Sequence, residues 1–335
     1  GAFSRSTNPL GNWDNMYDKI QSINLFMEKG VTDDVIYNRV SKETDQAIKT
    51  RLLGEAYFLR AWCSFKLLQT YGGRTDEGEA LGYTITNHFI GDKESAKPSL
   101  FKRDSYKDCV SQIVSDCEEA ARRLPVTYTG DDVVVGKSKI GRACGLAANA
   151  LKARTLLYAA SPLFNEKPIE SGNELIGYAS YDRERWKIAA DAARNFINTY
   201  GTGDGAIMGL DDNFKNVFTN WYSNEHKEVI FFRENAMDKT VETANGPLGL
   251  SGAKQGNGRT NPTQNLVDAF LMKDGHFIND KGKYEYNEQL PYAQRDPRLE
   301  YTIIHNGSSW VNSTMETWQG GANNPLGSSY SLTSY

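Results

Sequence analysis

The residues of this chain best suited to chemistry are aromatic side chains in polar, loop-like sequence. A flat ring can stack on the C–H face of a sugar, while nearby amide and hydroxyl groups match the sugar's donors and acceptors. Rings flanked by Asn, Ser, Gln or Pro occur in the second half of the chain, at Trp221, Tyr222, Tyr292, Trp310 and Trp318. Asn257 and Arg259, in a glycine-rich stretch, are weaker candidates for the same site. Each ring could instead merely anchor its own loop, so the prediction concerns the group.

Catalytic and metal-binding motifs are missing from the sequence. The four histidines lie far apart, and no metalloprotease, nucleophile-elbow, P-loop or dinucleotide-binding pattern occurs. A glycoside hydrolase needs only two converging carboxylates, and 42 acidic residues leave that alternative open. Asp211 and Asp212 lack the remaining spacing of a calcium loop and are interpreted as a solvated turn. We therefore predict a non-enzymatic protein without cofactor or metal.

Four cysteines share an apolar helical context. No CxxC or Cys/His ligand spacing occurs, so zinc is poorly supported. We predict buried structural thiols at Cys63, Cys109, Cys117 and Cys144.

Apolar residues recur at three- and four-residue steps through the first two hundred positions. This spacing predicts five amphipathic helices, at about 13–27, 44–71, 106–124, 142–160 and 182–200. The second is apolar on two sides and must be sandwiched between neighbours, while Ser105 to Asp108 forms a capping box for the third. Trp13, Trp62 and Trp186 lie on apolar stripes and are predicted to be core residues. Stacked helical hairpins of tetratricopeptide type follow, although the repeat signature is missing.

The sequence changes in texture after residue 200. Gly, Asn, Ser and Thr dominate, and regular elements are short. The clearest expectations are a strand at 228–232, a helix at 265–272 and a second strand from the alternation of Leu299, Tyr301 and Ile303. Long loops in a compact protein commonly carry function.

Composition and charge are those of a globular protein. The apolar share is 39% and the charged share 24%, and six Trp, 18 Tyr and 14 Phe make the chain rich in aromatics. The net charge of −4 and the lack of a basic run disfavour nucleic acid as a partner. No segment approaches the roughly 18 apolar residues of a membrane span. The first residues, Gly1-Ala2-Phe3, suggest a start downstream of a processing site.

Four segments, in order, resemble the SusD/RagB family of outer-membrane nutrient-binding lipoproteins. They are Gly54-Glu55-Ala56-Tyr57-Phe58-Leu59-Arg60-Ala61-Trp62 with Tyr71-Gly72-Gly73, Ala153-Arg154 with Leu157-Tyr158-Ala159-Ala160-Ser161-Pro162-Leu163-Phe164-Asn165, Asn261-Pro262-Thr263-Gln264-Asn265-Leu266-Val267-Asp268-Ala269-Phe270 with Asp274-Gly275, and Arg295-Asp296-Pro297-Arg298-Leu299. The resemblance covers nearly the whole chain. It also suggests a member that lacks its C-terminal part and its N-terminal lipid-bearing cysteine.

The charged residues within these signatures have a structural interpretation. Glu55 and Arg60 lie on the sandwiched helix, which favours buried or half-buried ion pairs with neighbouring helices. Asp296 and Arg298 flank a proline and can bind nearby backbone or each other.

The resemblance implies a mainly α fold: a SusD-like α/α superhelix of degenerate tetratricopeptide-like helix pairs with an irregular, loop-rich ligand-binding half. We expect one domain over 1–335, with a helical scaffold at 12–200 and the loop-rich region at 201–335. The implied function is cell-surface binding of a glycan or similar nutrient and its delivery to a TonB-dependent, SusC-like outer-membrane transporter, with a lipid anchor in the outer membrane. The alternatives are a glycoside hydrolase, or a scaffold that docks the transporter without binding ligand itself.

Overall fold

The computed structural model describes residues 11–74, 80–97, 99, 101–165, 172–203, 205–219, 227–233, 238–250 and 256–324. The chain forms two compact units, residues 1–210 with 227–233 and residues 211–226 with 234–335, and each is described by itself. None of the helices described is long and apolar enough to span a membrane.

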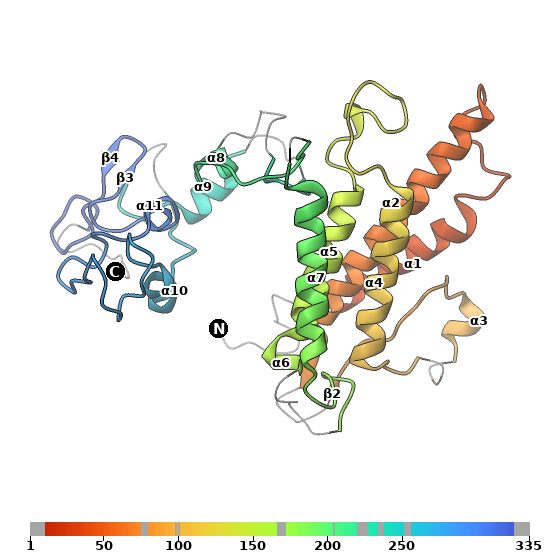
Figure 1. Cartoon of the computed structure of the whole chain (residues 1–335), viewed down its shortest axis with the longest axis horizontal. Helices are drawn as coiled ribbons and strands as arrows, with labels where there is room; N and C mark the ends of the chain where they lie inside the picture. Colours follow the sequence, from red (N-terminus) through yellow and green to blue (C-terminus); the bar gives the residue numbers. More distant parts are fainter. Residues whose placement is uncertain are drawn as a thin grey trace. The chain divides into compact units, whose positions relative to one another are not determined.

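The first unit is a stack of long helices in which chain neighbours pack side by side (Figure 1). The long helices are α1 (Trp13–Lys29), α2 (Lys42–Tyr71), α4 (Tyr106–Arg123), α5 (Gly145–Ala160) and α7 (Arg183–Tyr200). Shorter elements connect them, namely the antiparallel pair β1 (Gly73–Arg74) and β2 (Ala80–Leu81), α3 (Asp92–Ser95), the 3-10 turn η2 (Lys137–Lys139) and α6 (Pro162–Asn165). The mainly α fold and the five predicted helices are confirmed, with ends shifted by a few residues.

Helix α2 is buried on both sides because α1 and α4 pack against it. Phe58 and Phe65 are each 1% exposed, and Trp62 is half-buried against the same core. The caps are local: Ser41 accepts a hydrogen bond from the backbone N–H of Thr44, and Ser105 accepts one from Asp108 at the start of α4. The apolar residues on two sides of α2 are thus explained by its two neighbouring helices, as predicted.

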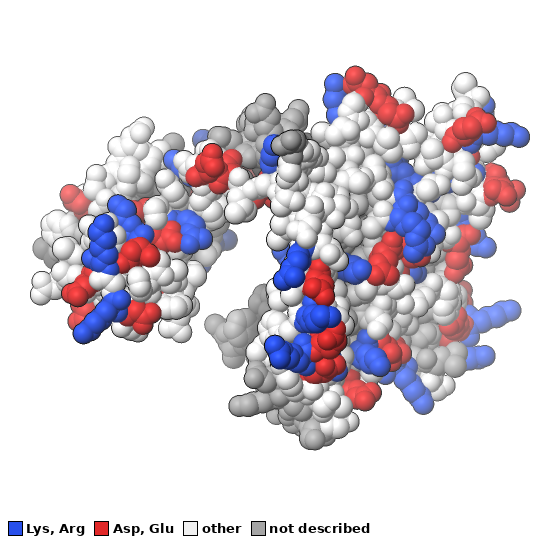
Figure 2. All heavy atoms as spheres, viewed as in Figure 1, with Lys and Arg blue, Asp and Glu red and all other residues white. Residues whose placement is uncertain are grey.

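Ion pairs hold polar side chains inside this stack. The Arg60 guanidinium donates to both carboxylate oxygens of Asp116 on α4, at 2.8 and 2.7 Å, and to the amide oxygen of Asn24 on α1 at 3.0 Å. Glu55 pairs with Arg51 and Arg142. The ion pair predicted between Arg60 and a neighbouring helix is confirmed, whereas Glu55, although buried and paired, finds its partners on its own helix and in the loop before α5. Lys, Arg, Asp and Glu intermix on the visible face of the helical unit (Figure 2).

All four cysteines are buried and free, as predicted. Burial raises the pKa of Cys63 to about 11 and that of Cys109 to about 12. Cys144 is the N-cap residue of α5 rather than a residue inside a helix.

One predicted core residue is wrong. Trp186 on α7 is 38% exposed, whereas Trp13 is half-buried against Tyr17 and Tyr71. Helix α7 packs chiefly on α5, and Ala189 is its one buried residue, at 4% exposed. An apolar stripe is buried only where a neighbour covers it.

The second unit consists of short elements joined by long loops. They are α8 (Asn216–Thr219), α9 (Thr240–Asn245), α10 (Gln264–Ala269), α11 (Pro297–Thr302), and the antiparallel strands β3 (Ser309–Trp310) and β4 (Ser313–Thr314). Its small core comprises Val267, Leu299 and Ile303. Arg295 is 6% exposed and donates to the carbonyl oxygens of Val267 and Phe270, at 2.7 Å each, which closes the end of α10.

Both strands predicted for this part of the chain are wrong. Residues 228–232 form no strand. Phe231, which lies in this segment, packs against Phe58 and Trp62 of the helical unit. Leu299, Tyr301 and Ile303 lie on or just after α11: Asp296 caps this helix and pairs with Arg298, as expected for these two charges. Leu299 and Ile303 are four residues apart, so they also share one helical face. The helix predicted at 265–272 is the shorter α10.

Candidate functional site

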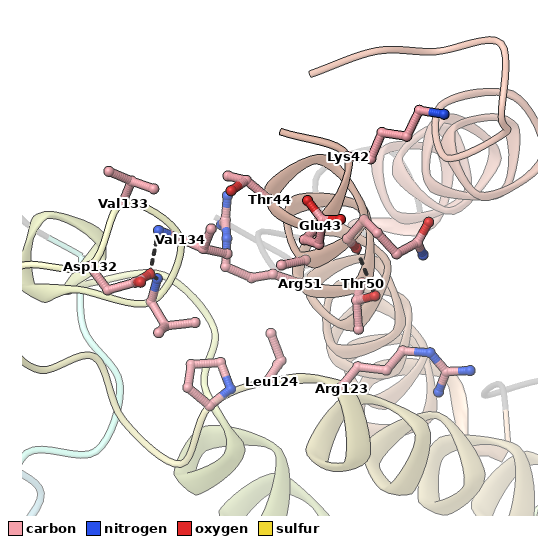
Figure 3. A pocket seen from close by; sticks show the side chains of 14 residues that line it. Lys42, Glu43, Thr44, Thr50, Arg51, Arg123, Leu124, Asp132, Val133 and Val134 are labelled. Carbon is pink, nitrogen blue, oxygen red and sulfur yellow. Dashed lines mark hydrogen bonds between the residues drawn. The ribbon is translucent and has the colours of Figure 1, made fainter. Parts of the chain in front are cut away.

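Two pockets are candidates for a binding site. The larger, of about 970 Å³, opens in the helical unit between the first turns of α2, the end of α4 and residues 132–135. In Figure 3, Arg51 extends from α2 toward Val134, and Asp132 accepts a hydrogen bond from the backbone N–H of Val134. None of its 14 described lining residues is aromatic. It therefore lacks the ring face that sugar stacking requires.

The second pocket lies within the second unit and has a volume of about 510 Å³. We call it the Trp310 pocket. Four segments distant in sequence line it: Val241, Glu242, Asn245, Gly246, Pro247 and Leu248; Gly258, Thr260, Asn261 and Pro262; Thr302, Ile303, Ile304 and His305; and Trp310, Met315 and Thr317. Apolar side chains and an indole alternate with amides and hydroxyls, the combination by which proteins hold and orient sugars.

Backbone hydrogen bonds join the first two segments. The N–H groups of Asn257, Gly258 and Arg259 donate to the carbonyl oxygens of Thr243, Gly246 and Ala244, at 2.8, 3.0 and 3.1 Å. A Cβ on Gly256 would lie only 2.1 Å from the carbonyl oxygen of Gly246, so this approach requires glycine. The hydroxyl of Thr260 donates to the amide oxygen of Asn245 at 2.6 Å. The polar wall of the pocket is thus held in place by its own bonds.

The Trp310 ring is presented by a two-residue turn between β3 and β4. Val311 and Asn312 at the turn have φ of 44° and 60°, the left-handed conformation that such turns need. Trp310 is half-buried, and its ring lies against Gly246. Its buried Nε1 has no hydrogen-bond partner among the residues described. A ligand therefore meets the apolar ring rather than the indole N–H.

His305 also lines the pocket and is 7% exposed. Its Nε2 lies 2.8 Å from a carboxylate oxygen of Glu300, and its Nδ1 lies 2.7 Å from the carbonyl oxygen of Asn306. Both ring nitrogens are therefore engaged by oxygens of the chain itself.

The aromatic candidates from the sequence fall in different places. Trp310 lines the pocket, while Tyr292 is not among the lining residues: it stacks on the His305 ring, with centroids 3.7 Å apart, and packs on the small core. Trp318 follows the lining residue Thr317 and is 55% exposed. Trp221 and Tyr222 lie outside the described residues.

The two polar candidates flank the lining rather than form it. Asn257 and Arg259 are exposed and sit on either side of Gly258 in the loop that lines the pocket. Sequence reasoning missed Glu242, Asn245 and His305, because no spacing in the sequence relates the segments that carry them. Only the amide and hydroxyl composition of the loops pointed toward such residues.

Metal and acid chemistry receive no support from the described residues. They contain no group of three His, Cys, Asp or Glu side chains placed to hold a metal ion. A carboxylate oxygen of Asp211 accepts a hydrogen bond from the backbone N–H of Asn213 at 2.8 Å, as in an ordinary turn.

The chain matches known proteins both in family models and in solved structures. A SusD family model matches residues 227–333, and a model described as starch-binding and associating with the outer membrane matches residues 3–156. The chain belongs to the SusD/RagB family. SusD-family proteins are non-catalytic glycan-binding proteins, in agreement with the predicted absence of enzymatic activity. The family description also indicates association with the outer membrane.

Solved SusD-like structures share the fold of this SusD-family chain. A SusD-like protein from Bacteroides fragilis matches with a TM-score of 0.63 and 22% identity, over 96% of this chain and 56% of that one. A SusD-like carbohydrate-binding protein from the same species gives 0.62 and 22%, over 94% and 50%. A laminarin-binding SusD-like protein gives 0.50 and 17%, over 98% and 62%. The chain thus spans about half to three fifths of the length of these proteins. No curated protein shows significant sequence similarity to it.

Proposed function

We propose that this chain binds an oligosaccharide at the cell surface, in the Trp310 pocket. The observation that supports this proposal is one indole face in a pocket of about 510 Å³ with the amide and hydroxyl groups of Asn245, Asn261, Thr260 and Thr317. This volume holds about two or three sugar rings, and the polar groups offer both donors and acceptors. Membership of a glycan-binding family points the same way.

Binding is tested by titration calorimetry of the folded chain with maltohexaose and laminarihexaose. Starch and laminarin are the polymers named for the matching family model and for one structural relative. We expect Trp310→Ala to weaken binding by about tenfold or more, since stacking contributes about 0.5–1.5 kcal/mol beyond burial of the ring. The matched control is Trp186→Ala, which removes an exposed indole from α7 in the other unit. Equal affinities for Trp310→Ala and the unmodified chain would refute the proposed site.

We further propose that the bound glycan is delivered to a TonB-dependent, SusC-like transporter, and that an N-terminal lipid holds the protein at the outer membrane. The family resemblance and the family's association with the outer membrane support this part. Co-purification with the transporter separates it from ligand binding. If Trp310→Ala loses the glycan and keeps the transporter, the two activities are independent; if glycan binding is never seen and the transporter is retained, the chain is only a docking scaffold.

A further inference from the structure

The charges around the Trp310 pocket discriminate between kinds of glycan. Among the described residues that line it, only Glu242 and His305 are ionisable. Glu242 lies on α9, and its side chain is exposed at the pocket. A residue that carries a carboxylate is therefore part of the pocket lining.

The histidine does not offset this carboxylate. Both ring nitrogens of His305 are engaged, by Glu300 at 2.8 Å and by the Asn306 carbonyl oxygen at 2.7 Å. Both nitrogens are therefore taken up within the chain, and neither is left to neutralise the carboxylate of a ligand. Arg259, the nearest arginine in sequence to the lining residues, is exposed beside Gly258 and does not line the pocket.

From these positions we infer that the Trp310 pocket selects neutral glycans and rejects uronate-containing ones, with Glu242 as the residue that sets this preference. The inference rests on the proposed function. A sugar carboxylate in the pocket meets a like charge with no lining arginine or lysine to neutralise it. The neutral amides and hydroxyls of Asn245, Asn261, Thr260 and Thr317 bind neutral sugar hydroxyls without that cost.

The test compares chains of equal length that differ in charge. Calorimetry at low ionic strength gives dissociation constants for laminarihexaose or maltohexaose and for hexagalacturonate. The measured quantity is the dissociation constant of hexagalacturonate divided by that of the neutral glycan. A change that affects both glycans equally therefore cancels. We expect hexagalacturonate to bind on the order of tenfold more weakly, and this gap to shrink as salt screens the repulsion.

Glu242→Gln removes the charge and keeps the shape of the side chain. We expect Glu242→Gln to lower the ratio of the hexagalacturonate to the neutral dissociation constant several-fold. The matched control is Glu288→Gln, which changes the net charge equally at an exposed position outside the pocket lining, and it should leave the ratio unchanged.

The possible outcomes separate the two proposals. Hexagalacturonate binding as tightly as the neutral chains overturns the inference and leaves glycan binding standing. A ratio that Glu242→Gln does not narrow, or that Glu288→Gln narrows equally, overturns the role of Glu242. Binding of neither class by the folded chain removes the proposed function and the inference with it.

Discussion

Arg60 is a buried charged residue that links three helices of the helical unit. Its guanidinium joins α2 to Asp116 on α4 and to Asn24 on α1, and it is 6% exposed. Burying such an ion pair contributes little net stability over an apolar pair, but breaking it leaves one charge uncompensated.

We expect Arg60→Ala to lower the free energy of unfolding by about 3–5 kcal/mol, measured by urea denaturation. Asp116→Ala should cost a similar amount, whereas the double substitution Arg60→Met with Asp116→Leu should cost less than the sum of the two alanine substitutions, because no charge is left unpaired. Arg122→Ala is the control: its pair with Glu119 is exposed and worth at most about 1 kcal/mol. A loss for Arg60→Ala no larger than that of the control contradicts this account.

Among the short elements, α11 connects the fold of the second unit to its pocket. Asp296 accepts a hydrogen bond from the backbone N–H of Arg298 at 2.9 Å, and Thr302, Ile303, Ile304 and His305 at the other end line the Trp310 pocket. The Arg298 hydrogen bonds lower the pKa of Asp296. The stability contributed by this ionised cap is therefore present above the ordinary value of 3.8 and is lost as pH falls through the lower, folded-state value.

We expect Asp296→Ala to lower the free energy of unfolding by about 1 kcal/mol and to weaken glycan binding, since the cap fixes the start of the helix that carries part of the lining. Asp296→Asn is the matched variant, because asparagine caps as well as aspartate, and it should retain most of the stability. Urea denaturation and calorimetry measure the two effects. Equal losses for both variants would mean that the ion pair, rather than the cap, is what matters.

The elements differ in how well their type and bounds could be predicted from the sequence. Helices α1, α2, α4, α5 and α7 are long enough for several turns of periodic apolar residues, and their ends were predictable within a few positions. In α11 the alternation of Leu299, Tyr301 and Ile303 favoured a strand, although Asp296 and Pro297 form a helix start. Residues 229–232 form an apolar run, and Phe231 in this run packs on α2. Local sequence cannot show whether such a run pairs with another strand or packs on a helix.

For the molecule as a whole, burial of the thiols ties stability to alkaline pH. The pKa of Cys63 is raised to about 11 and that of Cys109 to about 12 from an ordinary value of 9.0, chiefly by desolvation. A thiol whose pKa is raised by folding contributes its full stability below the unfolded value and loses it as pH rises through the folded value.

We therefore expect the free energy of unfolding to fall between about pH 9 and pH 12, by about 3 kcal/mol for Cys63 and about 4 kcal/mol for Cys109 once each is fully ionised, at about 1.36 kcal/mol per pKa unit. Urea denaturation at pH 8 and pH 10.5 measures the change. Cys63→Ala should reduce the pH dependence while lowering the stability at pH 8. A free energy of unfolding that is unchanged between these two pH values argues against this explanation.

The pocket, too, is a property of the whole second unit. Trp310 was predictable because an aromatic residue among polar neighbours is a recognisable pattern, whereas Glu242, Asn245 and His305 were not. They lie on segments up to about seventy positions away from Trp310, and only the folded backbone brings these segments together. Tyr292 shows the converse. It has the same sequence pattern, but its ring stacks on His305 and does not line the pocket.

The buried cysteines also make the protein convenient to label. With Cys63, Cys109, Cys117 and Cys144 all enclosed, a maleimide dye has no native target on the folded chain. A single new thiol, introduced as Asn257→Cys beside the Trp310 pocket, would carry the fluorophore alone and report sugar capture as a change in emission.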